Sequence, residues 1–149
     1  MTMTRDDVTK KIIATKVSKG IKWADAAKKI GLSKEFCTTV LLGQGVLTPA
    51  EAKKAAKVFG LNAEETKWLS VVPYRGGLPT AVPTDPLIYR FYELLQTNGL
   101  AIKALIEEEF GDGIMSAIDF TMDIQREPDP KGDRVHIVMS GKFLGYKRT

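Results

Sequence analysis

The chain has 149 residues, of which 44% are hydrophobic and 27% charged, a balance that predicts a folded protein and excludes a disordered one. One cysteine, Cys37, and one histidine, His136, exclude an intrachain disulfide and an ordinary zinc site built from cysteine and histidine. The net charge of +4 is uneven, since residues 1–70 hold 13 basic and 7 acidic side chains (net +6) and residues 71–149 hold 9 and 11 (net −2), which predicts two units with different roles.

Residues 6 to about 70 predict an all-helical unit, because apolar residues recur there at helical spacing between capping and stop signals. Four helices are predicted from four apolar sets: Val8, Ile12, Ile13 and Val17; Trp23, Ala26, Ala27 and Ile30; Phe36, Cys37, Val40 and Leu41; and Ala52, Ala55, Ala56 and Phe59. A fifth, short helix is predicted from Asn62 to Ser70.

Start and stop signals bound these helices. Ser33 and Thr48 are predicted N-caps, and Thr48 is followed by Pro49 at the first helical position and by Glu51 at the capping-box position. Glycines at positions 20, 31 and 60 are predicted to end the first, second and fourth helices.

The spacing of Ala27, Gly31 and Cys37 is typical of a helix-turn-helix, which makes a DNA-binding regulator with a C-terminal dimerisation domain the alternative function. A recognition helix needs basic or amide side chains for phosphate and base contacts. The stretch 34–42 offers only Lys34 as a base, directly before Glu35. The pattern therefore favours a compact bundle that binds no nucleic acid.

Residues 73–83 are predicted to be a linker, because prolines and a glycine pair there disfavour helix and central strand. This divides the chain into an N-terminal helical domain (1–72), the linker (73–83) and a C-terminal domain (84–149). No stretch reaches the roughly 20 apolar residues that a membrane span needs, and the first residues contain no apolar signal core. With its lone cysteine, the chain is expected to be cytoplasmic and to avoid membranes.

The C-terminal domain opens with a strong helix start, in which Asp85 caps and Pro86 takes the first position. Asn98-Gly99 is a predicted stop, and a second helix is predicted over 100–110. A stripe of Leu87, Phe91, Leu94 and Leu95 is predicted to be buried. Arg90 and Glu93 lie together on another face.

Two strands are predicted after this helical region. Apolar and polar residues alternate over 118–125, residues 127–133 read as a turn, and 135–139 predict a return strand that contains His136. An isolated hairpin is marginal in water and leaves both edges unpaired. We therefore expect these strands to pair with another copy of the chain.

The C-terminal motifs resemble one known family. Thr84-Asp85-Pro86, Tyr89-Arg90-Phe91-Tyr92-Glu93, Lys103-Ala104-Leu105 and the run Phe110-Gly111-Asp112-Gly113-Ile114-Met115-Ser116-Ala117-Ile118 are similar to the signature region of the cyanases (cyanate hydratases). The layout of a helical unit followed by a short α+β unit agrees over nearly the whole chain, and the last dozen residues match less clearly.

The resemblance implies an α+β fold, with a repressor-like N-terminal helical bundle and a C-terminal unit whose β-hairpin is intertwined with a partner subunit. It implies homodecamers of five dimers, with sites shared between subunits. It also implies bicarbonate-dependent decomposition of cyanate to carbamate and carbon dioxide, after which carbamate decays to ammonia and carbon dioxide. Bicarbonate is a co-substrate, and no metal or organic cofactor is used.

The resemblance assigns the catalytic roles to Arg90, Glu93 and Ser116. From the pattern alone, Arg90 and Glu93 fit a surface ion pair better than a catalytic pair, and Ser116 fits a loop residue better than a catalytic one. Under the implied reaction they make chemical sense, because a fixed guanidinium offsets the repulsion of two anions and a serine adds a hydroxyl donor. Whether Glu93 moves a proton or orients Arg90 stays open. Dianions such as oxalate or malonate are expected to inhibit.

Overall fold

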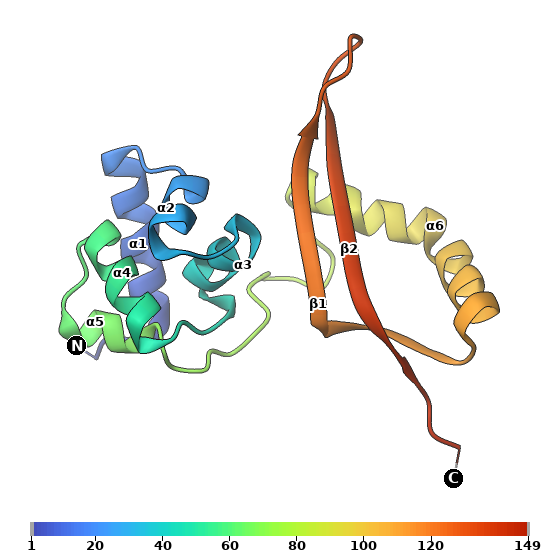
Figure 1. Ribbon diagram of the computed structural model, residues 1–149, viewed down its shortest axis with the longest axis horizontal. Helices are drawn as coiled ribbons and strands as arrows, with labels where there is room; N and C mark the ends of the chain where they lie inside the picture. The colour runs from blue at the N-terminus through green and yellow to red at the C-terminus, as the bar shows by residue number, and fades with distance from the viewer. Residues whose placement is uncertain (1, 149) are drawn as a thin grey trace. The chain divides into compact units, whose positions relative to one another are not determined.

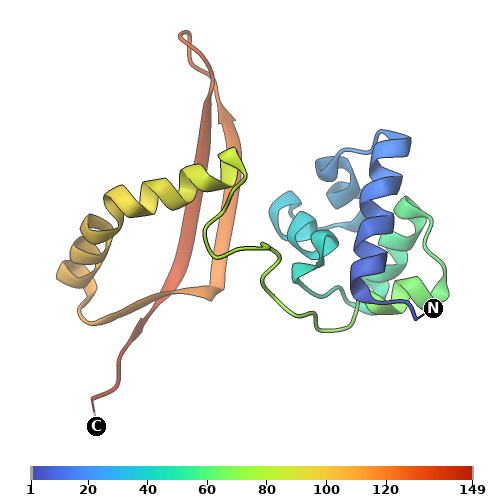
Figure 2. The ribbon, with the colours of Figure 1, turned by 180° about the vertical axis from the view of Figure 1, so that it is seen from behind.

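The computed structural model describes residues 2–148, and the chain divides into two compact units, Met1–Gly77 and Leu78–Thr149. Each unit is described here by itself. Figure 1 shows short helices in the first unit, and one long helix with a two-stranded hairpin in the second; Figure 2 shows the same elements from behind. The predicted α+β class is confirmed. None of the helices within residues 2–148 combines the length and the apolar character needed to cross a bilayer.

The first unit consists of helices around a single hydrophobic core. Its elements are α1 (Arg5–Lys19), α2 (Trp23–Ile30), α3 (Lys34–Thr39), the π-helix η1 (Val40–Gln44), α4 (Pro49–Phe59) and α5 (Ala63–Trp68). The core consists of buried side chains that lie between Val8 and Leu69 in the sequence, and Phe59 is the largest fully buried one. Every buried hydrophobic residue found within residues 2–148 belongs to this unit.

The predicted helix caps are confirmed. Each cap depends only on nearby residues, so residue type and spacing are enough to predict it. Ser33 Oγ accepts from the Phe36 amide at 3.2 Å. Thr48 Oγ1 accepts from the Glu51 amide at 3.2 Å, and the Glu51 carboxylate accepts from the Thr48 amide at 2.9 Å. The glycines at 20, 31 and 60 end their helices in the left-handed region, with φ of 63°, 90° and 66°.

The predicted inner face of α1 is partly wrong. Val8 and Ile12 are buried, but Ile13 and Val17 are exposed. Arg5 and Thr9 are buried instead: the Arg5 guanidinium donates to Thr9 Oγ1 and to the Val40 carbonyl, both at 2.6 Å. Two of the guanidinium nitrogens have partners, whereas Arg5 Nε is buried without one. A long, partly satisfied cation can thus replace apolar side chains on a helix face, which apolar spacing alone does not reveal.

The third predicted helix is split. It passes from α3 into η1, where Gly43 has a φ of 95°, and Phe36 is half exposed rather than inward. Cys37 is fully buried, and burial raises the pKa of its thiol to about 11, so little reactive thiolate exists at neutral pH. Lys34 forms an ion pair with Glu35, so the one basic side chain of residues 34–42 is partly neutralised and less suited to bind a DNA phosphate.

Glu65 links α5 to α1. Lys11 Nζ donates to both carboxylate oxygens, at 2.9 and 2.8 Å, and the Asn62 amide donates to Oε2 at 2.8 Å. The bond from Lys11 first, and that from the Asn62 amide second, lower the pKa of Glu65. The ionised carboxylate therefore adds stability above its unfolded-state pKa, and this stability is lost as the pH falls through the lowered folded-state pKa.

We expect Glu65→Gln to lower the free energy of unfolding of this unit by about 1–2 kcal/mol at neutral pH, because the partly exposed charged pair is lost. The difference from the wild type should shrink in acid, because the stability from the ionised carboxylate is lost as the pH falls below its unfolded-state pKa toward the lowered folded-state pKa. Urea unfolding followed by tryptophan fluorescence measures it, since Trp23 and Trp68, the two tryptophans, both lie in this unit. Glu64→Gln, at the exposed neighbour, is the control; an equal loss at pH 3 and pH 7 would contradict the assignment.

Residues 71–85 contain neither helix nor strand, as the proline and glycine pattern predicts. The Gly76 amide donates to Gln44 Oε1 at 2.7 Å, so the start of this segment is held against η1.

The second unit begins with one helix rather than the two predicted. Helix α6 runs from Pro86 to Phe110, and Asp85 Oδ1 caps it by accepting from the Leu87 and Ile88 amides at 2.9 and 3.0 Å. The predicted stop at Asn98-Gly99 is wrong: the Asn98 side-chain amide donates to the Leu94 carbonyl at 3.0 Å, inside the helix. One glycine costs a helix only about 1 kcal/mol, which a long helix tolerates. The helix changes direction along its length (Figure 1).

A two-stranded antiparallel sheet completes the unit. Strand β1 covers Gly113–Glu127 and β2 covers Arg134–Gly145, so both are longer than predicted, and the predicted turn lies between them. His136 is a strand residue, as predicted, with Nδ1 3.5 Å from Glu127 Oε2. The ladder is regular from Phe120↔Gly141 to Glu127↔Arg134 and again from Gly113↔Gly145 to Met115↔Phe143, with an irregularity between.

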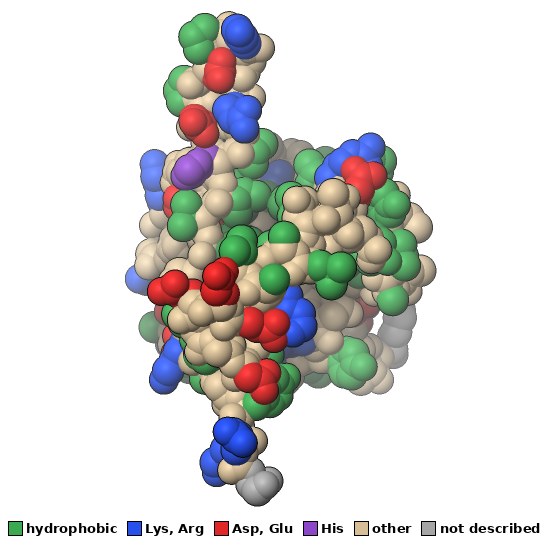
Figure 3. Space-filling model, turned by 90° about the vertical axis from the view of Figure 1, so that its right-hand side faces the viewer, with side chains coloured by type: hydrophobic (Ala, Val, Ile, Leu, Met, Phe, Trp, Pro, Cys, Tyr) green, Lys and Arg blue, Asp and Glu red, His purple; other side chains and the backbone are tan. Residues whose placement is uncertain are grey.

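The second unit leaves its apolar residues uncovered. The predicted burial of the α6 stripe is wrong for a single chain, because Leu87, Phe91, Leu94 and Leu95 are between 47% and 70% exposed. In residues 78–148, 19 large hydrophobic side chains are exposed, against 7 in residues 2–77. Figure 3 shows hydrophobic side chains at several places on the face that it draws. A unit of this composition lacks the buried apolar area that stabilises a fold in water.

Candidate active site

Arg90 and Glu93 stand one turn apart on α6, and both side chains are exposed. The Arg90 guanidinium carbon lies 5.9 Å from the centre of the Tyr89 ring, within the range of a weak cation–π contact. No hydrogen bond or ion pair joins Arg90 to Glu93 anywhere in the described part of the chain. The surface ion pair that their spacing allows is not formed, so both charged groups keep their hydrogen-bonding capacity.

Ser116 has the opposite environment. It is 5% exposed and is the one buried residue within 78–148. Its Oγ accepts hydrogen bonds from the Ile118 amide at 3.0 Å and the Asp119 amide at 2.9 Å. A hydroxyl has two acceptor positions and one proton, so two amide donors leave only the proton for a further partner. Ser116 is thus arranged as a hydrogen-bond donor, and its oxygen is poorly placed to act as a nucleophile.

Within one described chain, Ser116 makes no polar contact with the two charged candidate residues. Within residues 2–148, no hydrogen bond or ion pair links Ser116 to Arg90 or to Glu93. The serine lies on β1, and the two charged residues lie on α6. The Tyr146 amide donates to the Asp112 carbonyl at 3.1 Å, which holds the residue after β2 against the turn between α6 and β1.

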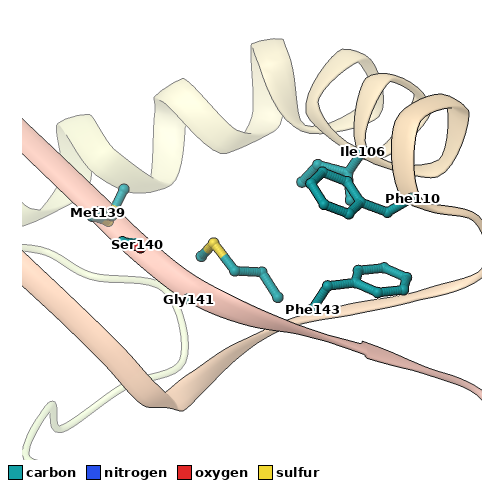
Figure 4. Close-up of a pocket in the computed structure, with 7 residues that line it drawn as sticks. Ile106, Phe110, Met139, Ser140, Gly141 and Phe143 are labelled. Atoms are coloured by element: carbon teal, nitrogen blue, oxygen red, sulfur yellow. The ribbon is translucent and has the colours of Figure 1, made fainter.

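An apolar hollow of about 270 Å³ lies between the end of α6 and the hairpin (Figure 4). It is lined by Ile106, Phe110, Met115, Met139, Ser140, Gly141 and Phe143. Phe110 of α6 and Phe143 of β2 stack there, with ring centres 5.2 Å apart. The hollow contains neither charged candidate residue, so it suits an apolar side chain rather than an anion.

The sequence gives no signal for the two amides that hold Ser116. Any residue except proline supplies a backbone amide, so residues 118 and 119 carry no distinguishing side-chain chemistry. That Ser116 is the one buried residue within 78–148 becomes evident only from the structure.

Two family models together match nearly the whole chain. The model described as "Cyanate hydratase, N-terminal" matches residues 5–73, and the model described as "Cyanate lyase C-terminal domain" matches residues 80–148.

Individual proteins give the same result. The chain is 68% identical over 145 residues to the cyanate hydratase of Variovorax paradoxus (strain S110) and 60% identical over 145 residues to that of Ralstonia pickettii (strain 12J), in each case over 97% of this chain and 99% of the relative. A crystal structure of cyanase from T. urticae is similar with a TM-score of 0.80 and 36% identity, over 93% of this chain and 96% of that one.

Proposed function

This chain belongs to the cyanate hydratase family, and we propose that it decomposes cyanate in a bicarbonate-dependent reaction at a site formed by Arg90, Glu93 and Ser116. The observation that carries the proposal is the identity of 60–68% to proteins named cyanate hydratase, over 97% of the chain.

In the proposed reaction, a bicarbonate oxygen forms a bond to the cyanate carbon. The C–O bond between that oxygen and the former bicarbonate carbon then breaks, carbon dioxide leaves, and one proton from the medium is taken up as carbamate forms. Carbamate takes up a second proton and decays to ammonia and carbon dioxide. Because bicarbonate is itself the nucleophile, the enzyme needs no activated cysteine or histidine, and positioning with electrostatics supplies the catalysis.

The three residues have complementary roles in this proposal. Two small anions repel each other in a site that excludes water, and the Arg90 guanidinium offsets that repulsion with a fixed charge and forked donors. Ser116 supports the anionic adduct with the one proton that its surroundings leave available. Glu93, one helical turn from Arg90, orients the guanidinium or carries the proton that the reaction takes up.

We further propose that several copies complete each site, as a homodecamer of five dimers whose hairpins are intertwined. Two observations support a shared site: within one described chain no hydrogen bond links Ser116 to Arg90 or Glu93, and residues 78–148 expose apolar side chains that need a cover. Under this proposal residues 84–149 form the catalytic and dimerisation domain. Residues 1–72 form a separate helical domain, 73–83 are the linker, and the protein is cytoplasmic.

Ammonia release from cyanate, measured with and without added bicarbonate, tests the function. We expect release that depends on both anions and saturates with each. A regulator that binds DNA would release no ammonia under either condition, and that result would refute the proposed activity.

Oxalate and malonate are expected to compete with the substrates, because each places two carboxylates where the two anions meet and fits a site with a guanidinium and a hydroxyl donor. Initial rates at several cyanate and bicarbonate concentrations measure this as a rise in apparent KM at constant kcat. Acetate, which has a single carboxylate, is the control; equal inhibition by acetate and oxalate would argue against a site for two anionic groups.

A further inference from the structure

The stretch that carries Ser116 is an irregularity in the hairpin. Met115 pairs with Phe143, and the next pair is Phe120 with Gly141, so the four residues 116–119 of β1 lie opposite the single residue Lys142 of β2. Such a bulge bends a strand and redirects its side chains, and Figure 1 shows β1 turning sharply. The bulge also lets the Ile118 and Asp119 amides turn back onto Ser116 Oγ.

Gly141 lies directly against this bulge on the facing strand. A Cβ atom on Gly141 would stand 2.3 Å from the Ser116 carbonyl oxygen and 2.6 Å from Met115 Cγ. The methionine side chain can move, but the carbonyl belongs to the bulge backbone, so any side chain at position 141 would displace the segment that holds the serine. The φ of Gly141 is not positive, so space, not backbone conformation, requires glycine here.

We infer that Gly141 is a positioning residue for Ser116: its missing side chain lets the backbone of residues 116–119 lie against β2 and aim the serine hydroxyl. The inference rests on the proposed function, in which Ser116 contacts the reacting anions. It adds a residue of β2 that touches no substrate and acts only through the serine.

Gly145 offers a matched control on the same strand. A Cβ there would meet its nearest atoms, the Asp112 oxygen and Phe143 Cε2, at 3.7 Å, an ordinary contact. Gly145→Ala and Gly141→Ala therefore make the same chemical change in β2, and only the second crowds the bulge.

The experiment is a double-mutant cycle on the assembled enzyme, with kcat and KM for cyanate measured at saturating bicarbonate, and particle size by sedimentation. We expect Gly141→Ala to lower kcat by about 10–100-fold at unchanged size, because small misplacements of a catalytic group are costly. Gly145→Ala should stay within about twofold of the wild type. In a Ser116→Ala background, Gly141→Ala should lower kcat further by less than about threefold, since the serine through which it acts is already absent.

Each other outcome overturns the inference in a recognisable way. If Gly141→Ala lowers kcat equally in both backgrounds, its role is general and structural. If Ser116→Ala is inactive while Gly141→Ala matches Gly145→Ala, this inference fails and the proposed site stands. If the Ser116→Ala enzyme has normal kcat, the proposed role of the serine is refuted, and this inference, which depends on that role, is refuted as well.

If the Gly141→Ala chain does not assemble alone, oligomers mixed from two variant chains test the inference instead. Oligomers mixed from Gly141→Ala and Arg90→Lys chains should regain activity, because each chain supplies the residue that the other lacks. Mixtures of Gly141→Ala with Ser116→Ala should not, because neither chain has a well-placed serine. Failure of the Gly141→Ala chain to enter either mixture, or recovery in both, would overturn the inference.

Discussion

Arg90→Lys is expected to lower kcat by about 10²–10³-fold while the oligomer stays intact, because it keeps the charge and removes the forked donors. A lysine ammonium is a point charge on a flexible stem, so it cannot hold two oxygens in one plane. Arg90 is exposed in the single chain and makes no hydrogen bond or ion pair within residues 2–148, so the folded chain should tolerate the change.

The measurement is steady-state ammonia release combined with particle size by sedimentation. Arg75→Lys, an exposed arginine of the linker region, provides the control and should keep wild-type turnover. Near-normal turnover of Arg90→Lys would mean that the guanidinium does not bind the reacting anions.

Leu100→Lys is expected to break the assembly and, with it, the activity. Leu100 on α6 is 84% exposed in one chain, where a lysine would change the stability by no more than about 0.5 kcal/mol. If another copy covers this face, the same lysine must bury an unpaired charge, which costs several kcal/mol. We therefore expect smaller particles and a loss of activity of about tenfold or more at low protein concentration.

Val17→Lys is the matched control, because Val17 is 75% exposed on the helical unit. Tryptophan fluorescence should report a folded first unit in both variants, since both tryptophans lie there. A Leu100→Lys protein that keeps the size and turnover of the wild type would show that this face of α6 is not covered.

Features set by nearby residues could be predicted from the sequence. The cap of α4 needs only Thr48 and Glu51, the end of α2 needs only Gly31, and the start of α6 needs only Asp85 and Pro86. These signals depend on contacts within one helical turn, so spacing and residue type are enough.

Features that depend on contacts between distant residues could not be predicted from the sequence. The Asn98-Gly99 signal is a genuine local stop signal, yet α6 continues through it because a helix of 25 residues tolerates the cost of one glycine. Arg5 is buried because its guanidinium donates a hydrogen bond to the Val40 carbonyl, 35 residues away. The apolar stripe of α6 stays exposed, because one chain provides nothing to bury it.

The residues of the candidate site could be predicted from the sequence, but their environment could not. Family resemblance predicts Arg90, Glu93 and Ser116 as site residues, whereas their spacing alone also fits a surface pair and a loop residue. That Ser116 is buried, accepts two amide bonds and lies against Gly141 depends on how β1 and β2 pair, which no local pattern encodes.

The central claim is that a guanidinium of one chain and a serine hydroxyl of another chain together hold the two anions. Mixing unfolded Arg90→Lys and Ser116→Ala chains, refolding them together and measuring ammonia release tests it most directly. If each site takes one arginine and one serine from randomly mixed chains, about a quarter of the sites contain both native residues and activity returns. A mixture that assembles fully yet stays as inactive as either parent would contradict the account.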